Sequence, residues 1–236
     1  MILSTVIIFI TVKSTVIFEL NMKIAIIGAT GFLGSHLIKE ATNRGLEVTA
    51  IARNTDKITD KNVRKVAVDV NNVKELSEVL KGHDAVISAY NAGWTNPNIY
   101  DDFIEGSKSI QQAVKKSGVE RLIVIGGAGS LYVDDKLQLI DTPEFPADYK
   151  PGASAARDYL NILKEEKDLD WAFFSPAIEM NAGVTTGRTG KYRLGKDNPV
   201  FDKNNVSTLS GEDVAVVLLD EVEHPKHHQE RFTAAY

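Results

Sequence analysis

The feature that most constrains the fold is a short apolar run that ends in three regularly spaced glycines. Residues 24–27 read Ile-Ala-Ile-Ile, and Gly28, Gly31 and Gly34 follow before a helical pattern begins. A continuous apolar run of this length is typical of a strand in a parallel sheet that is covered on both faces. The first glycine permits a sharp turn, the second leaves room for a phosphate group, and the third lets the helix pack closely on the strand.

The residues around these glycines indicate the purpose of the turn. A helical pattern covers Phe32 to Arg44, and a second strand is predicted at Glu47 to Ala52, so the glycines join a strand to a helix in a βαβ unit. The free N–H groups at the start of such a helix, together with its dipole, favour an anion. We therefore predict a nucleotide phosphate site here. The alternative is an ordinary glycine-rich turn that binds no ligand.

Composition argues against several classes of protein. With 236 residues, 43% hydrophobic and 25% charged, the chain is long enough for one globular domain. A net charge of −5 without blocks of Lys and Arg argues against nucleic acid or a membrane surface as partner. The lack of cysteine excludes disulfides and thiolate chemistry, and it suits a reducing compartment. We expect a cytoplasmic monomer or homodimer. His224, His227 and His228 lie in a polar segment typical of a solvated turn, so we predict no metal site.

The first 20 residues are rich in Ile, Val, Phe and Thr and differ from the rest of the chain. A signal peptide or membrane anchor is one interpretation. Against it, no basic segment precedes the apolar stretch, and Lys13 divides that stretch into pieces too short to span a bilayer. Met22 stands directly before the first predicted strand. We therefore interpret residues 1–21 as an upstream extension and 22–236 as a single domain.

Strand-like and helical patterns alternate along most of the chain, which predicts βαβ units and a parallel sheet. With right-handed crossovers the result is an α/β fold with a doubly wound, Rossmann-like sheet. The predicted strands are 23–28, 47–52, 63–68, 84–88, 120–125 and 170–175, and the predicted helices are 32–44, 73–81, 98–117 and 154–167, with a short one at 55–59.

The pattern changes after Pro176. Residues 177–209 are rich in Gly, Thr, Asn, Lys and Arg, with short strand candidates at 190–194 and 198–201. A helix is predicted behind Ser210 as its N-cap, and a last strand at 231–235. Because this tail is too short for a domain of its own, we interpret it, from about residue 177, as a flap that binds substrate over the strand ends.

Several segments together resemble the atypical short-chain dehydrogenase/reductases. They are the glycine motif at 28–34, Arg53, Asp69 with Val70, the loop 126–130, and residues 175–177, each placed after a predicted strand. Residues 141–146 and 189–195 resemble segments of the NADH-flavin reductase group, which is similar to NmrA-like and biliverdin reductase B-like NAD(P)-binding proteins. The resemblance implies that the dinucleotide contacts Gly28, Thr30, Gly31, Phe32, Leu33, Arg53, Asp69, Val70, Ala89, Tyr90, Asn91 and Pro176.

Arg53 bears on the choice of cofactor. An acidic residue after the second strand would bind the ribose hydroxyls and repel a 2′-phosphate, whereas an arginine can hold that phosphate with a pair of charge-assisted hydrogen bonds. The sequence Ala52-Arg53-Asn54, with Lys57 behind it, therefore favours NADP(H) over NAD(H). The alternative is a solvated arginine at the end of a strand.

The catalytic residues are not evident. Classical members of the superfamily use a helical Tyr-x-x-x-Lys pair, and the two matches, Tyr132 to Lys136 and Tyr192 to Lys196, fall outside the expected helix. Where the serine and the histidine of biliverdin reductase B are expected, this chain has Gly127 and Ala177. The remaining catalytic candidates are Lys150, Tyr149 and Ser130.

Flavin reduction tolerates these losses, because the reduced ring can take its proton from solvent and the protein supplies placement. An aromatic-lined pocket would suit that acceptor, and Trp94, Tyr132 and Tyr149 are the predicted substrate-binding residues, with Tyr90 and Phe145 as further candidates. The alternative for Trp94 is packing on its own loop. We predict hydride transfer from NADPH to a small planar acceptor such as a flavin. The rival is a non-catalytic, NmrA-like redox sensor that acts through a protein partner, and sugar-nucleotide reduction or epimerisation ranks third.

Overall fold

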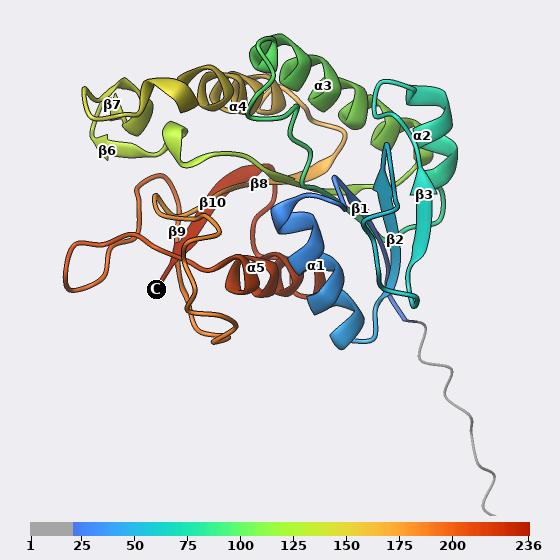
Figure 1. Ribbon diagram of the computed structural model, residues 1–236. Helices are drawn as coiled ribbons and strands as arrows, with labels where there is room; N and C mark the ends of the chain where they lie inside the picture. Colours follow the sequence, from blue (N-terminus) through green and yellow to red (C-terminus); the bar gives the residue numbers. More distant parts are fainter. Residues whose placement is uncertain (1–20) are drawn as a thin grey trace, which may run out of the picture.

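A computed structural model of the chain describes residues 21–236, so the predicted extension lies outside the described residues except for Asn21. One mostly parallel sheet runs through the molecule (Figure 1). Its strands, in spatial order, are β3 (Arg64–Ala67), β2 (Glu47–Ala52), β1 (Lys23–Ile27), β4 (Ala85–Ser88), β5 (Arg121–Ile125), β8 (Asp170–Ser175), β10 (Glu230–Ala235) and β9 (Arg193–Gly195). Within this sheet, as described for residues 21–236, only β9 pairs in the antiparallel sense.

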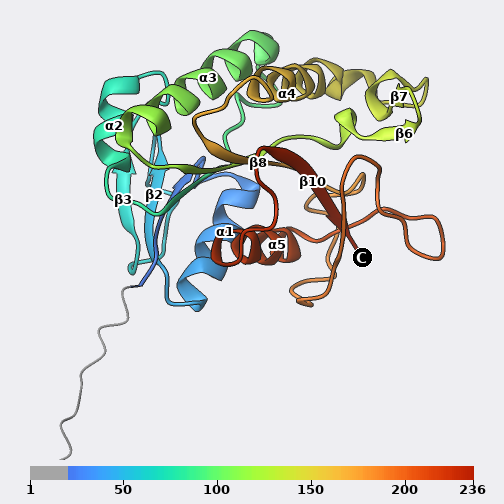
Figure 2. The same cartoon turned by 180° about the vertical axis from the view of Figure 1, so that it is seen from behind.

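Helices cover both faces of this sheet (Figures 1 and 2). On one face lie α2 (Val73–Leu80), α3 (Ile99–Ser117) and α4 (Lys150–Leu163), and on the other lie α1 (Phe32–Asn43) and α5 (Gly211–Glu223). Two apolar clusters fill the two interfaces, one of them around Phe174 and Phe232 and the other around Trp171 and Phe173. Successive residues of β8 therefore point to opposite cores, as the pleat of a strand requires. The predicted doubly wound α/β fold is confirmed.

The strand order reverses next to β1. Ile27 at the end of β1 pairs with Ile51 of β2 on one side and with Ser88 of β4 on the other. The chain leaves β1 for β2 and later returns to β4, so the connections on the two sides run over opposite faces of the sheet. A crevice forms at such a point, just beyond the carboxyl ends of the strands, and ligands of open α/β sheets bind there.

Some local predictions were wrong. The fourth helix begins at Lys150 rather than at 154, with Pro151 in its first turn, where a missing N–H costs nothing. Residues 55–59 form turns instead of a helix, and 198–201 form no strand. The hairpin of β6 (Tyr132–Asp134) and β7 (Leu137–Gln138) was not predicted, because strands of two or three residues show no hydrophobic period. A short 3₁₀ turn at Ala128–Ser130 leads from β5 into this hairpin, and two more, at Leu139–Asp141 and Ala147–Tyr149, lie between the hairpin and α4.

The tail after Pro176 is not a flap over its whole length. Helix α5 packs beside α1, and β10 lies inside the sheet between β8 and β9, so both belong to the core. The fully buried Asp213 of α5 accepts hydrogen bonds from the Thr189 amide at 2.9 Å, the Gly190 amide at 2.8 Å and the Thr189 hydroxyl at 2.6 Å. Within the tail, residues 177–209 are mostly loop apart from β9, and this buried carboxylate ties the segment around Thr189 to the core.

None of the helices within residues 21–236 is both long enough and apolar enough to cross a membrane. Across residues 21–236, no group of three His, Cys, Asp or Glu side chains is arranged to hold a metal ion. In the predicted solvated turn, the His227 Nδ1 lies 2.8 Å from Glu221 Oε2 and the His228 Nδ1 lies 2.8 Å from Asp170 Oδ1.

Candidate functional site

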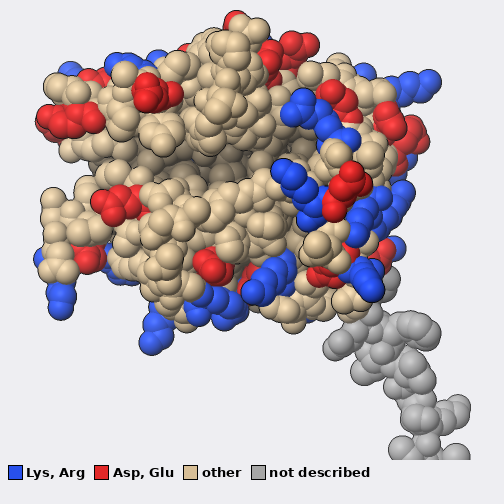
Figure 3. Space-filling view, in the orientation of Figure 1, with Lys and Arg blue, Asp and Glu red and all other residues tan. Residues whose placement is uncertain are grey.

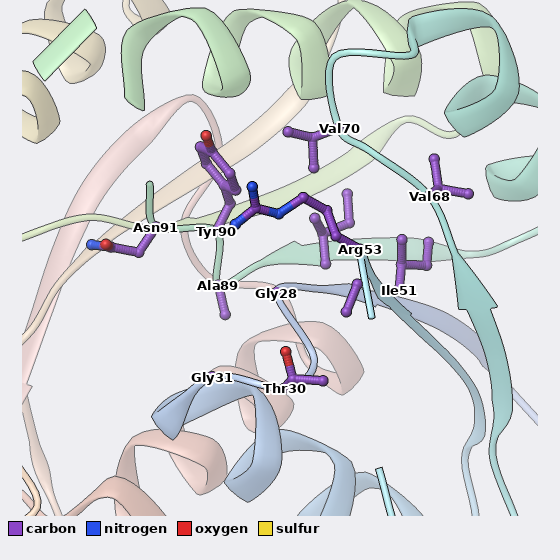
Figure 4. A pocket seen from close by; sticks show the side chains of 12 residues that line it. Gly28, Thr30, Gly31, Ile51, Arg53, Val68, Val70, Ala89, Tyr90 and Asn91 are labelled. Carbon is purple, nitrogen blue, oxygen red and sulfur yellow. The ribbon is translucent and has the colours of Figure 1, made fainter. Parts of the chain in front are cut away.

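A pocket opens at the crevice where the strand order reverses (Figure 4). It lies beyond the carboxyl ends of β1, β2 and β4, and the segment after β3 closes one side. Most of the predicted dinucleotide residues meet here, although the sequence spreads them over more than sixty positions. The lining residues are Ile27, Gly28, Thr30, Gly31, Ile51, Ala52, Arg53, Val68, Val70, Ala89, Tyr90 and Asn91.

The glycines of the turn pack so closely on neighbouring backbone that no side chain would fit at two of them. Gly28 has a φ of +79°, and a Cβ on it would lie 2.4 Å from the Ala89 carbonyl oxygen. A Cβ on Gly34 would lie 2.2 Å from the Gly28 carbonyl oxygen, so the third glycine brings α1 against the strand. A side chain at either glycine would therefore push neighbouring backbone segments apart.

The first turn of α1 is free to receive an anion. Its N-cap is Gly31, which has no side chain to accept hydrogen bonds from the first N–H groups, and no acidic residue lies in the first turn. The helix dipole adds positive potential at this end. Thr30 points into the pocket beside the same turn (Figure 4). The cradle therefore fits a pyrophosphate, as the glycine spacing predicts.

The other end of the pocket fits a nucleoside. Ile51, Val68 and Val70 form an apolar wall (Figure 4). Asp69 is exposed and its carboxylate accepts a hydrogen bond from the Asn71 amide at 2.9 Å, so it lies beside the wall rather than in the lining. Its predicted contact with the dinucleotide stays a prediction.

Arg53 extends from the end of β2 across the mouth of the pocket toward Tyr90 (Figure 4). The side chain is exposed, and no carboxylate in residues 21–236 lies within ion-pair distance of it. A guanidinium without an internal partner beside a nucleoside pocket can pair with a phosphate of the ligand.

Tyr90 is a fixed wall of the pocket. Its ring lies 6.0 Å from that of Phe103 and occupies the space above Gly106, where a Cβ would lie 2.5 Å from it. Its hydroxyl donates to the Asp102 carbonyl oxygen at 3.0 Å. Burial, and then the charge of Asp102, raise the pKa of Tyr90, so the phenol stays neutral. Tyr90 therefore shapes the site as a neutral, hydrogen-bonded wall.

Besides Asp69, three predicted dinucleotide residues lie outside the lining of the pocket. Phe32 is exposed and packs edge-on against His36, with 5.0 Å between the ring centroids. Leu33 packs against the core on the other side of the helix. Pro176 is buried directly after β8. The structure leaves their contacts with a dinucleotide as predictions.

Trp94 and Tyr149 come together at the same edge of the sheet. Trp94 belongs to the loop after β4 and Tyr149 directly precedes α4, and their rings meet edge-on with 5.3 Å between centroids. They are 58% and 53% exposed, the two most exposed of the large hydrophobic residues described. We call them the aromatic pair. Two unusually exposed, touching aromatic rings are typical of a binding surface.

The aromatic pair has a rigid support. The Trp94 ring lies on Gly152 of α4, where a Cβ would be 2.9 Å from its Cζ3 atom. The Asn96 side chain donates to the Asp102 carboxylate at 2.7 Å, which ties the loop to α3. The alternative for Trp94 was packing on its own loop. Its ring instead lies on α4.

Ser130 does not face the site. It is only 2% exposed, and its hydroxyl lies 3.4 Å from that of Ser175 and accepts a hydrogen bond from Arg231 at 3.3 Å. The prediction of a catalytic role for Ser130 is corrected, because a substrate cannot reach a hydroxyl so enclosed. Lys150, exposed at the start of α4, stays a candidate beside Tyr149.

Tyr132 is held elsewhere. The Arg231 guanidinium lies over its ring at 5.5 Å, and its backbone amide donates to the Asp197 carbonyl at 2.8 Å. It belongs to the β6–β7 hairpin and does not join the aromatic pair. Its partner in the Tyr-x-x-x-Lys match, Lys136, lies in the turn of that hairpin, so the match is a coincidence of spacing.

Arg231, Gly152 and Asp213 were missed by the sequence analysis. Arg231 holds the loop after β5, Gly152 supports Trp94, and Asp213 fixes the loop 187–191. No local pattern marks them, because each acts on a segment far away in the sequence.

Comparisons with known proteins agree with this geometry. The sequence model of the NAD(P)H-binding family matches residues 28–225. A solved structure from Bacteroides thetaiotaomicron, named a "putative epimerase", is 49% identical with a TM-score of 0.83, and the match covers 92% of this chain and 97% of that one. The "putative NADH-flavin reductase" of Streptococcus pneumoniae TIGR4 is 34% identical with a TM-score of 0.78, over 91% of this chain and 99% of that one. The uncharacterized protein YwnB of Bacillus subtilis (strain 168) is 40% identical over 214 residues, 90% of this chain and 97% of its own length.

Proposed function

This chain belongs to the NAD(P)H-binding family of Rossmann-fold oxidoreductases, and we propose that it passes a hydride from NADPH to a flavin or a similar planar acceptor. The observation that carries the proposal is the aromatic pair, which lies exposed at the same sheet edge as the phosphate cradle. A planar acceptor that packs on these rings would lie beyond the dinucleotide end of the crevice. The name printed for the Streptococcus pneumoniae relative supports the same reaction class.

The chain's own residues would do three things in this reaction. The glycine turn and the first turn of α1 would hold the pyrophosphate of the dinucleotide, which supplies the hydride when bound. Arg53 would pair with the 2′-phosphate, which favours NADPH over NADH. The aromatic pair would orient the acceptor and exclude water from one face of it.

The proton balance is compatible with this site. A reduced flavin can take its second proton from solvent, so no buried relay is required. That matters because Ser130 is enclosed, the Tyr90 hydroxyl already donates to the Asp102 carbonyl oxygen, and α4 carries no tyrosine four residues before a lysine. Epimerisation or carbonyl reduction would need a placed acid or base that this site lacks, apart from Lys150 and Tyr149.

The second candidate is a dinucleotide-binding sensor that acts through a protein partner. It is favoured by the same lack of a proton relay, because a sensor needs the cradle but no chemistry. Cytoplasmic location and a monomeric or homodimeric state stay predictions.

The test is a titration of the full chain with NADPH and NADH, followed by loss of the reduced-nicotinamide absorbance on addition of riboflavin, FMN or FAD. Saturable, flavin-dependent oxidation supports the reductase, and it should fall at least tenfold in Trp94→Ala (about 1.4 kcal/mol of lost transition-state binding). Phe201→Ala removes another exposed aromatic side chain, one that does not contact the aromatic pair, and should leave turnover unchanged. Tight NADPH binding without oxidation above the buffer control would favour the sensor.

A further inference from the structure

We infer that the acceptor of this site carries no phosphate group, so that riboflavin or an uncharged quinone-like ring suits it better than FMN or FAD. The inference rests on the proposed function and concerns the chemistry of the acceptor alone. It is carried by the distribution of charge along the crevice and by the ion pairs of two arginines.

Positive charge gathers at the dinucleotide end of the crevice. Figure 3 shows a hollow between the α3–α4 side and the α1–α5 side of the molecule, with Lys and Arg atoms at the end where β2 and β3 lie. Arg53 lines the pocket at this end, and Lys39 and Lys57 line a second pocket that shares Thr30 with it. The unpaired cations near the hollow are therefore placed for the phosphates of the dinucleotide.

The opposite end of the hollow is uncharged within and acidic at its rim. Toward the β6–β7 hairpin its walls are formed by uncharged residues, and Asp or Glu atoms stand on both lips (Figure 3). Of the segments that follow β5 and β8, Gly126 and Gly127 are half-buried, Pro176 and Ala177 are buried, and none of the four carries charge. A phosphate placed here would meet no cation from these segments.

The arginines around this end are already paired. Arg157 of α4 donates to Asp158 at 3.1 Å and to Asp141 at 3.4 Å. Arg231 of β10 donates to the Asp197 carboxylate from both Nε and Nη2. Each would have to leave a carboxylate before it could bind a phosphate of the acceptor.

Within residues 21–236, two lysines toward this end form no ion pair, Lys136 in the β6–β7 turn and Lys150 of α4, and each has an aspartate within two residues in the chain. Lys150 follows Tyr149 and Asp148 precedes it, so the exposed ends of the two side chains flank the aromatic pair with no net charge. The Trp94 and Tyr149 rings themselves offer apolar surface, which suits an uncharged fused ring. A phosphate monoester carries roughly −1.5 to −2 charges at neutral pH and gains nothing from such a site.

The test compares riboflavin with FMN, which differ by one phosphate, on the full chain with saturating NADPH. Riboflavin should show at least about fivefold higher kcat/KM, because the phosphate of FMN would approach the acidic rim, and one unfavourable pair of unit charges at contact distance in water produces that factor. Quenching of flavin fluorescence should show the same order of affinity without turnover. The difference should shrink in high salt, because the repulsion is screened.

A charge-reversal pair of variants locates the effect. Asp148→Lys should bring the FMN value up to that of riboflavin, whereas Glu120→Lys makes the same change in net charge at an exposed position before β5, at the opposite edge of the sheet. Equal effects of the two variants, or FMN equal to riboflavin in the unaltered protein, would overturn the inference and leave the reductase standing. Absence of oxidation with every flavin and quinone tested would instead overturn the proposed function, and this inference with it.

Discussion

Replacement of Arg53 by alanine separates the two cofactors. In the structure this side chain crosses the mouth of the nucleoside pocket and has no ion pair with residues 21–236, so its removal takes no stabilising contact from the fold. If it holds the 2′-phosphate, Arg53→Ala should weaken NADPH and spare NADH, because only the first of these carries that phosphate. The melting temperature should stay within about 2 °C of the parent value, as expected for an exposed side chain without a partner.

The magnitude follows from the exposure of the site. Hydrogen bonds to charged groups contribute about 1.5–3 kcal/mol, which corresponds to roughly 10- to 150-fold in Kd. Because Arg53 is exposed, solvent screening places the expected loss near the lower limit, about tenfold. Arg53→Lys keeps the charge but loses the paired hydrogen bonds and should fall between the two.

The assay is equilibrium binding of NADPH and NADH followed by nucleotide fluorescence. Arg64→Ala is the matched control, since Arg64 is another exposed arginine at the start of β3, at the edge of the sheet away from the pocket. Equal loss of NADPH and NADH in Arg53→Ala, or an equal effect of Arg64→Ala, would refute the assignment of the 2′-phosphate to Arg53.

Three further predictions concern the cradle, the aromatic pair and stability. Gly28→Ala should abolish NADPH binding, because the new Cβ would lie 2.4 Å from the Ala89 carbonyl oxygen. Gly45 is the control, since it has a similar φ of +77° but open space around it. Gly45→Ala should cost only about 1–2 kcal/mol of stability and leave binding intact. Gly152→Ala should displace Trp94, 2.9 Å from the new methyl group, so that flavin turnover falls while NADPH binding and melting temperature are nearly preserved; unchanged tryptophan emission would contradict this. Burial opposes ionisation of Glu166, but hydrogen bonds from a backbone amide, a glutamine and a lysine outweigh it and lower its pKa from 4.5 to about 2. The contribution of the Glu166 carboxylate to the free energy of unfolding is therefore complete above about pH 4.5 and is lost as the pH falls toward 2. Relative to its own stability at pH 7, the parent should lose more stability on acidification than Glu166→Gln, and its acid unfolding should begin at higher pH.

The elements of the dinucleotide half were predictable because their signals are local. The apolar run 24–27, the glycines after it and the first helix lie within about twenty residues, and their spacing alone specifies a strand, a turn and a helix. Arg53 was found for the same reason, since it directly follows a strand whose end is visible in the sequence. The start of α4 was misplaced by four residues, because Pro151 is equally compatible with a loop and with the first turn of a helix.

The acceptor half was predicted less well. Trp94 and Tyr149 were named separately, but nothing in the sequence shows that their rings touch or that Gly152 supports one of them. Ser130 looked accessible in a glycine-rich loop, yet Arg231, 101 residues away, helps to enclose it. The tail after Pro176 looked like a flap, yet its helix and last strand complete the core.

The sequence by itself determined the alternation of strands and helices, the phosphate cradle and the cation that follows β2, because these depend on periodicity and on residues that are neighbours in the chain. The tertiary structure alone decided which side chains meet at the far end of the crevice, which arginines are already paired there and which hydroxyl is closed off. Those contacts join segments separated by tens of residues, and they depend on how strands align and how loops fold over the sheet edge. The pattern of residues along the chain does not specify that alignment, because many tertiary arrangements of the chain satisfy the same local preferences.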